Sequence, residues 1–337
     1  MMNHYKNCRL CPRNCGVDRL AGEIGFCGET AVLRVGAALK HYGEEPPLVG
    51  TGGSGTIFVS GCNLGCSFCQ NYQVSQGERV TQIFSHRGHG DTESTEEDFK
   101  KNEEKIDCII GKEISIDEFA SICAALRDKG AVNINIVTGS HAIPALIEGF
   151  TAAKKAGTEL PVLWNSSGYE NVEALELLWD YVDVYLPDLK TLDTEIAGRY
   201  FNAPDYPQTA EAAILKMIDM KKSSPVPMEK VIIRHLILPG YLDSTRSVLK
   251  WFADNAAGRA QLSLMTQYTP IPNREKPMPQ GYVTKEDYET VMGWLREFNI
   301  EDGFCQELVT GNEWLPDFKH PNPFSSELSV PVWHFTD

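Results

Sequence analysis

Apolar runs rich in β-branched residues alternate along the chain with segments of helical periodicity. The runs predict buried strands at 55–61, 131–139, 160–168, 182–190, 230–240 and 260–270. The periodic segments predict helices at 115–130, 142–157, 171–181, 209–222, 243–257 and 284–299. Nearly continuous apolar strands that alternate with helices are typical of a parallel sheet covered on both faces. The pattern therefore predicts the α/β class.

Six strands are too few to close an eight-stranded barrel, and they fit either a curved partial barrel or an open doubly wound sheet. In both arrangements function collects at the carboxyl ends of the strands. The polar residues that accompany the strand ends are Thr138, Ser140, Asn165, Ser166, Ser167, Asp188, Lys190, Arg234, His235, Gln267 and Tyr268. We therefore expect one site built from several strand ends.

Other regions fall outside this repeat. A cysteine-rich extension covers 1–54, with short strands expected near 31–43, and the α/β body covers 55–300. Within the body, residues 79–113 are highly charged with little apolar periodicity, which predicts an exposed insertion. The tail at 301–337 has no regular period, so we expect it to be irregular and packed on the body through its aromatic residues.

The composition narrows the range of partners. Among 337 residues, 31 Lys and Arg against 46 Asp and Glu give a formal net charge of −15. This balance predicts no nucleic-acid partner and no membrane partner, because both depend on Lys and Arg to neutralise phosphate. The N-terminus has no apolar leader, and no apolar run is long enough to span a membrane. Ten cysteines in such a chain indicate a reducing, cytoplasmic location, where clustered cysteines bind metals more often than they form disulfides.

Three cysteines follow the first predicted strand in the stretch "GCNLGCSFCQN", as Cys62-x3-Cys66-x2-Cys69. Three thiolates leave one iron of a [4Fe–4S] cube without a protein ligand, and an open metal position is what catalysis needs. The alternatives are a structural zinc site completed by a distant His or Cys, and three buried thiols. The position of the loop after the first core strand favours the catalytic cluster. Phe68, just before the last cysteine, fits a residue that shields the cluster from water.

A second cysteine set lies upstream, at Cys8, Cys11, Cys15 and Cys27. Four soft ligands complete either a tetrahedral zinc site or a closed iron–sulfur cluster. The density of cysteines in so short a segment favours a metal site over free thiols. The sequence does not choose between zinc and an iron–sulfur cluster at this site.

The 62–69 loop matches the pattern C-x3-C-x-aromatic-C, and through it the chain resembles the radical S-adenosylmethionine (radical SAM) enzymes. Cys62, Cys66, Phe68 and Cys69 fill the pattern in full. The resemblance implies a partial (β/α)6 TIM-like barrel and a [4Fe–4S] cluster whose open iron binds S-adenosyl-L-methionine. It also implies that the reduced cluster cleaves this cofactor to methionine and a 5′-deoxyadenosyl radical, which abstracts hydrogen from a substrate.

Longer stretches extend the resemblance from Cys8 to about Gln306. "DLK" (188–190) and "IIRHLILPGYLDS" (232–244) are similar to the pyruvate formate-lyase activating enzymes. Together with "CRLCPRNCGVDR" and "YLPDLK" they resemble the PflX-like branch of that group. This resemblance implies an oxidoreductase that acts on a protein substrate, a glycyl-radical enzyme, and receives electrons from flavodoxin or ferredoxin.

The chain also departs from the activating enzymes. "VTGS" (137–140) replaces their Gly-Gly-Glu run, and Gln267 and Tyr268 stand where they tend to place a histidine. The candidates for contacts to the cofactor are Phe68, Thr138, Ser140, Asn165, Ser167, Asp188, Lys190 and Arg234.

Three further expectations concern single residues. We expect Arg234 to bind the methionyl carboxylate or a ribose, because a guanidinium recognises a carboxylate bidentately. Asp188 and Lys190 are expected to pair, either beside the cofactor or as a plain ion pair at the strand end. We expect Glu44 and Glu45 to lie in a solvated loop.

Two other functions stay open from the sequence. One is radical modification of a small molecule or a peptide. The other is a non-catalytic metal-binding or electron-carrying scaffold.

Overall fold

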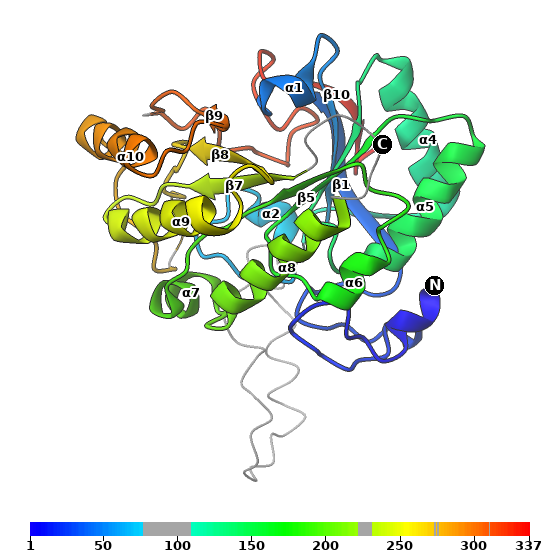
Figure 1. Ribbon diagram of the computed structural model, residues 1–337. Coiled ribbons are helices and arrows are strands. Elements are labelled where there is room, and N and C mark those ends of the chain that lie inside the picture. The colour runs from blue at the N-terminus through cyan, green and yellow to red at the C-terminus, as the bar shows by residue number, and fades with distance from the viewer. Residues whose placement is uncertain (77–108, 222–230, 273, 275, 310) are drawn as a thin grey trace.

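The computed structural model describes residues 1–76, 109–221, 231–272, 274, 276–309 and 311–337 (Figure 1). The predicted insertion at 79–113 therefore lies almost wholly outside the described residues. Within the described residues, strands and helices alternate as the hydrophobic pattern predicts.

Parallel strands of the described chain follow one another in chain order. They are β2 (Ser54–Val59), β4 (Ile134–Val137), β5 (Val162–Ser166), β6 (Val184–Pro187), β7 (Ile232–Leu236) and β8 (Gln261–Met265). β2, β4, β5 and β6 pair in this order in one sheet, and β7 pairs with β8 in a second. Parallel bridges at Tyr185–Val231 and Asp188–Arg234 join β6 to β7. Every one of these strands overlaps a predicted run.

The α/β class and the parallel pairing of these strands are thereby confirmed. β4 and β6 are buried at every position, as expected for strands covered on both faces. Among the described residues, no ladder closes β8 onto β2, so the barrel itself stays a prediction.

Helices follow most of the parallel strands, and in Figure 1 they succeed one another around the outside of the sheets. They are α4 (Ile116–Asp128), α5 (Ile143–Lys155), α6 (Val172–Glu176), α8 (Tyr206–Lys221), α9 (Leu242–Asn255) and α10 (Lys285–Glu297). The hydroxyls of Ser115 and Thr284 begin α4 and α10 as capping boxes, each accepting from a backbone N–H in the first turn. None of the described helices is both apolar and long enough to cross a membrane.

Short helices were not predicted. They are α1 (Pro46–Val49), α2 (Tyr72–Ser75) and α7 (Thr194–Phe201), with 3-10 turns at Met2–Tyr5 and Arg19–Ala21. The longest, α7, spans only slightly more than two turns, so these helices are too short for a helical period to stand out in the sequence.

Antiparallel strands extend the first sheet. β1 (Leu33–His41) pairs with β2, with β3 (Lys112–Ile114) and with the C-terminal strand β10 (Ser329–His334). β9 (Gly303–Cys305) adds a parallel strand to β8. The expectation of an irregular tail was therefore wrong in part, because β9 and β10 lie within it. β10 lies at the sheet edge, where Pro331 interrupts a ladder at little cost.

Candidate functional site

The triple-cysteine loop follows β2 at the carboxyl end of the parallel strands. Cys66 is buried, and Cys62 and Cys69 are partly exposed. The backbone N–H of Cys69 donates to the carbonyl of Cys66 at 3.3 Å, which closes a turn between them. The structure thus places all three thiols on one short loop at the edge where we expected them.

Helix α7 holds this loop in place. The backbone N–H of Ser67 donates to the carbonyl of Tyr200 at 2.7 Å, and that of Gly65 donates to the carbonyl of Phe201 at 3.3 Å. Tyr200 and Phe201 end α7, and the last carbonyls of a helix have no partner inside it. The loop supplies those partners, so the unpredicted helix positions the cysteines.

Aromatic rings pack behind the loop. Phe68 is 5% exposed, and its ring makes edge contacts with Tyr200, Phe201 and Tyr268 at centroid distances of 6.1, 5.8 and 5.6 Å. Such edge-to-face packing is the favoured arrangement of aromatic rings. The loop therefore rests on an apolar layer of aromatic rings. Tyr268 is part of this layer, at a position where the activating enzymes tend to have a histidine.

Polar groups lie beside two of the three sulfurs. The N–H of Leu64 points at Cys62 Sγ at 3.3 Å, and Ser75 Oγ lies 3.4 Å from Cys69 Sγ. Hydrogen bonds to sulfur stabilise metal-bound thiolates.

The loop holds neutral thiols until a metal binds. Burial raises the pKa of Cys66 to about 12, against the opposing effect of the Lys190 ammonium. Burial also raises the pKa of Cys62. A cluster therefore displaces protons from these thiols when it binds.

Asp188 and Lys190 form the predicted ion pair beside the cysteines, just after β6. Their side chains are 21% and 19% exposed. Burial acts to lower the pKa of Lys190, but the Asp188 carboxylate together with Cys66 and Tyr206 outweighs it, so the net direction is upward. The ammonium interacts electrostatically with Cys62 and Cys66 and acts to lower the pKa of both thiols, against the larger effect of burial. Lys190 therefore favours negative charge on the loop.

Further predicted residues gather at neighbouring strand ends. The N–H of Thr138 donates to the carbonyl of Asn165 at 3.0 Å, so the ends of β4 and β5 meet there. Tyr206 Oη accepts from the N–H of Lys190 at 3.0 Å and lies 2.9 Å from the carbonyl of Ser167. The side chains of Asn165 and Ser167 are partly exposed. The structure thus brings four of the candidates together around the carboxyl ends of β4, β5 and β6.

Ser140 does not belong to this group of accessible side chains. It is 2% exposed, and its hydroxyl donates to Glu170 Oε1 at 2.8 Å. Glu170 also accepts from Trp164 Nε1 at 2.8 Å and from the hydroxyl of Ser166 at 2.7 Å. Burial raises the pKa of Glu170, and these three donors act against it. The hydroxyl of Ser140 is therefore occupied by a buried carboxylate that sequence reasoning missed.

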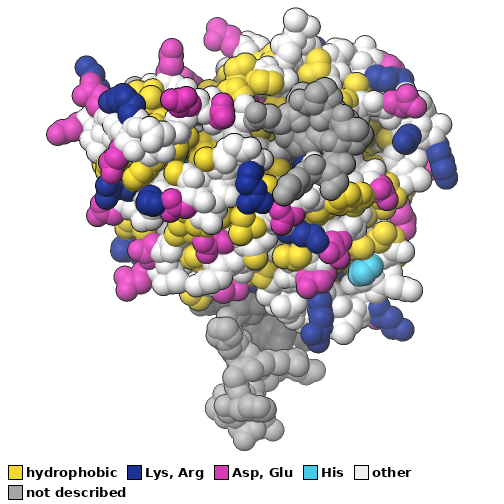
Figure 2. Space-filling model, in the orientation of Figure 1, with side chains coloured by type: hydrophobic (Ala, Val, Ile, Leu, Met, Phe, Trp, Pro, Cys, Tyr) yellow, Lys and Arg dark blue, Asp and Glu magenta, His cyan; other side chains and the backbone are white. Residues whose placement is uncertain are grey.

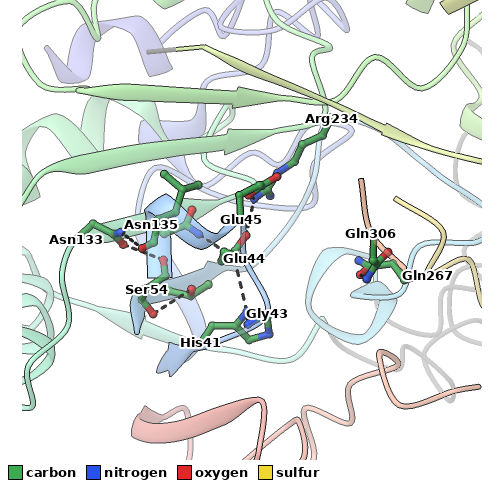
Figure 3. Close-up of polar contacts among 12 residues, drawn as sticks. His41, Gly43, Glu44, Glu45, Ser54, Asn133, Asn135, Arg234, Gln267 and Gln306 are labelled. Atoms are coloured by element: carbon green, nitrogen blue, oxygen red, sulfur yellow. Dashed lines mark hydrogen bonds and ion pairs between the residues drawn. The ribbon is translucent and has the colours of Figure 1, made fainter. Parts of the chain in front are cut away.

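Arg234 is likewise engaged by the protein itself. Its Nε donates to Glu45 Oε1 at 2.8 Å, and its Nη2 contacts both Glu45 Oε2 and Glu44 Oε2 (Figure 3). Glu45 is 7% exposed, and the Glu44 side chain is 10% exposed. The expectation that both glutamates are solvated was wrong, because the strand arginine draws them inward. An arginine within the apolar run "VIIRHLIL" indicates that acidic side chains are buried near it. The run does not identify which acidic residues these are.

Polar side chains extend this charged group across the sheet. Asn135 Nδ2, on β4, donates to Glu44 Oε1 at 3.0 Å, and His41 Nδ1 lies 3.7 Å from the same oxygen (Figure 3). Burial lowers the pKa of His41, so its ring is neutral at pH 7. Because β5 and β6 lie between β4 and β7, the Asn135–Glu44–Arg234 chain spans the face of the sheet from one strand to the other. We call His41, Glu44, Glu45, Asn135 and Arg234 the interior network.

Other contacts complete the surroundings of the loop. Gln70, next to Cys69, donates from Nε2 to the carbonyl of Gln267 at 2.8 Å, which ties the loop to the end of β8. Gln306 Nε2 donates to Gln267 Oε1 at 2.9 Å (Figure 3). His235 is 1% exposed and bonds to the Leu189 carbonyl and the Thr245 hydroxyl, as a core histidine does.

On the molecular face seen in Figure 2, acidic and basic side chains are interspersed and no continuous basic patch is visible. This mixture fits the net charge of −15.

Comparison with known proteins adds a family and a relative. A family model described as the radical SAM superfamily matches residues 56–252. The protein from Methanocaldococcus jannaschii named "Uncharacterized protein MJ0674" is 30% identical over 300 residues, which covers 89% of this chain and 77% of that protein.

Solved structures are similar at low identity. SuiB of Streptococcus suis bound to S-adenosylmethionine is 11% identical, with a TM-score of 0.48 over 73% of this chain and 48% of that chain. The FeFe-hydrogenase maturase HydG from Carboxydothermus hydrogenoformans is 12% identical, with a TM-score of 0.49 over 81% of this chain and 62% of that chain. The present chain thus spans about half of SuiB and less than two thirds of HydG.

Proposed function

The chain belongs to the radical SAM superfamily, and on this premise we propose that it abstracts a hydrogen atom from a glycine residue of a partner protein. It uses a [4Fe–4S] cluster and S-adenosyl-L-methionine, as the superfamily does. When bound, these groups supply the reductive cleavage that yields methionine and a 5′-deoxyadenosyl radical. The protein's part is to bind, orient and shield them.

The observation that carries the proposal is the cysteine loop at the carboxyl end of the parallel sheet. Cys62, Cys66 and Cys69 would hold the cluster, with a fourth position left for the cofactor. The Lys190 ammonium offsets part of the negative charge that three thiolates bring. Phe68 and the rings behind it exclude water from the back of the loop.

Contacts to the cofactor are part of the proposal. Thr138, Asn165 and Ser167 lie at adjoining strand ends, where a nucleoside and an amino acid group have polar partners available. The Asp188–Lys190 pair adds one charge of each sign to the same edge. Ser140 and Arg234 are omitted from this set, because carboxylates already occupy their side chains.

The activating role rests on two stretches of sequence and their placement. "DLK" (188–190) and "IIRHLILPGYLDS" (232–244) are the stretches similar to the activating enzymes. The bridge between Asp188 and Arg234 sets them side by side at the β6–β7 junction, next to the cysteine loop. Reduced flavodoxin or ferredoxin would supply the electron in this scheme.

A small polar molecule or a peptide is the second candidate substrate. The interior network favours it, because Arg234, Glu44 and Glu45 set charged groups on the inner face of the sheet rather than an apolar lining. Such groups can be retained for polar recognition as well as for structure.

The first experiment tests radical SAM chemistry itself. Protein reconstituted anaerobically with iron and sulfide is reduced with dithionite and supplied with S-adenosylmethionine. We expect release of 5′-deoxyadenosine and methionine, abolished by Cys66→Ala and retained by Cys123→Ala, which removes a buried cysteine of α4. Retained cleavage in Cys66→Ala would place the cluster elsewhere.

The second experiment separates the two substrate classes. Candidate glycyl-radical enzymes are mixed with the reduced protein and S-adenosylmethionine, and electron paramagnetic resonance (EPR) reports any glycyl radical. A radical on the partner supports the activating role. Sustained 5′-deoxyadenosine release with peptides or small polar molecules, and no radical on any partner, supports the second candidate instead.

A further inference from the structure

A guanidinium lies near the cysteine loop with no carboxylate partner in the described part of the chain. Arg274 belongs to the connection between β8 and α10, and its Nη2 donates to Gln76 Oε1 at 2.9 Å. Its Cζ lies 4.8 Å from the centre of the Tyr72 ring, in a cation–π contact. Among the described residues Arg274 forms no ion pair, and its Nη1 is buried without a hydrogen-bond partner. Arg274 therefore carries a positive charge and an N–H donor that the protein itself leaves unsatisfied.

Both of these contacts connect Arg274 to the cysteine loop. Gln76 Nε2 donates to the carbonyl of Cys66 at 2.9 Å, so one amide side chain joins the guanidinium to the loop. The N–H of Tyr72 donates to the carbonyl of Cys69 at 3.1 Å, which fixes the ring beneath the guanidinium at the end of the loop. Arg274 also lies close enough to Cys66 and Cys69 to interact with both electrostatically. The cation is thus held beside two of the three cysteines.

Other cations near the loop differ from Arg274 in their surroundings. Lys276 Nζ donates to the same Gln76 Oε1 at 3.0 Å, so two cations converge on one neutral oxygen. Their mutual repulsion opposes this arrangement unless negative charge lies near it. The charge of Lys190 is balanced by its ion pair with Asp188, whereas Arg274 has no such carboxylate among the described residues. This corner of the loop is therefore suited to an anionic group.

The anionic group that this loop would hold is the open cluster itself. A cluster bound by three thiolates is anionic, and the electron that reduces it makes it more negative. We propose that Arg274 is the charge partner of the cluster at Cys62, Cys66 and Cys69 and raises its reduction potential. The N–H that has no acceptor in the protein is available to a cluster sulfur, and hydrogen bonds to sulfur and nearby charge both tune such potentials.

The direction of the effect follows from the charges. One electron from an external donor enters the cluster, and no bond forms or breaks. Because the attraction to a nearby cation grows with the negative charge, Arg274 stabilises the reduced form more than the oxidised form. The cofactor can be cleaved only by the reduced cluster, so Arg274 makes the active form easier to reach. This inference rests on the cluster site of the proposed function and is independent of the substrate.

The test is a redox titration of Arg274→Gln, which removes the charge and keeps a polar side chain. Native protein and variant are reconstituted anaerobically, their iron content is compared, and EPR follows the reduced cluster as the potential is lowered with dithionite. We expect equal iron content. At a fixed potential the ratio of reduced to oxidised cluster should fall about tenfold in the variant, which is about 59 mV for one electron. Arg274→Lys keeps the charge and should recover most of the shift.

A matched control removes the same charge elsewhere. Arg259→Gln breaks an exposed ion pair with Asp219 and should leave the potential unchanged. A native potential in Arg274→Gln overturns the proposal, as does an equal shift in Arg274→Lys. Loss of iron from both Arg274 variants would show that the side chain only supports the loop. An unchanged potential with weaker binding of S-adenosylmethionine would assign the guanidinium to the cofactor carboxylate instead. Native protein that takes up no cluster would refute the cluster site itself, which separates that failure from the failure of Arg274 alone.

Discussion

Replacing Arg234 by methionine removes the only cation of the interior network among the described residues. Arg234 donates to Glu45 through Nε and Nη2 and to Glu44 through Nη2, and all three side chains are largely buried. Breaking a buried ion pair by removing one partner costs about 3–5 kcal/mol, because the other charge stays buried without compensation. We expect Arg234→Met to lose about that much free energy of unfolding at pH 7.

The free energy of unfolding that Arg234→Met loses should depend on pH. In the native protein burial acts to raise the pKa of Glu45, but Arg234, helped by hydrogen bonds from Ser263 and the backbone, outweighs burial, and the pKa lies below its ordinary value of 4.5. This stabilisation is present above pH 4.5 and is lost as the pH falls through the folded pKa. In Arg234→Met the buried Glu45 carboxyl has lost its cation and must take up a proton to become neutral. Counted from the ordinary pKa of 4.5 at 1.36 kcal/mol per pH unit, protonation costs about 3.4 kcal/mol at pH 7 and about 1.4 kcal/mol at pH 5.5. The difference in free energy of unfolding between the native protein and Arg234→Met should therefore narrow by about 2 kcal/mol between pH 7 and pH 5.5.

Urea unfolding of the metal-free proteins measures this gap, since loss of a cluster would make the transition irreversible. Arg246→Met is the matched control, because its ion pair with Glu297 is about half exposed and worth less than about 1 kcal/mol. Arg234→Met/Glu44→Gln/Glu45→Gln carries no buried charge in the network and should regain most of the stability. A loss below about 1 kcal/mol, or a gap that stays constant with pH, would refute the reasoning.

Three further substitutions test the surroundings of the cysteine loop. Lys190→Met leaves Asp188 unpaired beside the thiols and should lower the rate of S-adenosylmethionine cleavage by about 10- to 100-fold; an unchanged rate would show that the ion pair is only structural. Phe68→Ala should cost about 3–5 kcal/mol of stability and accelerate bleaching of the visible absorption in air; a bleaching rate equal to that of the native protein would contradict a shielding role. Ser140→Ala removes one donor from buried Glu170 and should cost about 1–3 kcal/mol while leaving the KM for S-adenosylmethionine unchanged; a raised KM would return Ser140 to the cofactor site.

Much of the fold follows from local sequence. Period-two and period-3.6 patterns identify the parallel strands and the longer helices, because each side chain's face is set by its own neighbours along the chain. The Asp188–Lys190 pair was predictable for the same reason, since residues two apart at a strand end project to the same side. The cysteine loop was identifiable because its three cysteines lie within a stretch of eight residues.

Short elements escaped the pattern. Helix α7 spans Thr194–Phe201, and β9 and β10 are three and six residues long. A period needs several repeats to be recognised; α7 and β9 supply about two at most, and Pro331 interrupts the alternation in β10. Yet α7 fixes the cysteine loop, so a feature too short to predict positions the chemistry.

The sequence by itself determined the class of fold and the superfamily, and it predicts the three cysteines that would hold the open cluster. Only the tertiary structure decided which polar side chains are free for a ligand. Ser140 is bound by Glu170 at a separation of 30 residues, and Arg234 by Glu45 at a separation of 189. A buried charge must be compensated by whatever group the fold brings near it, and that group is chosen by the packing of strands and loops rather than by distance along the chain.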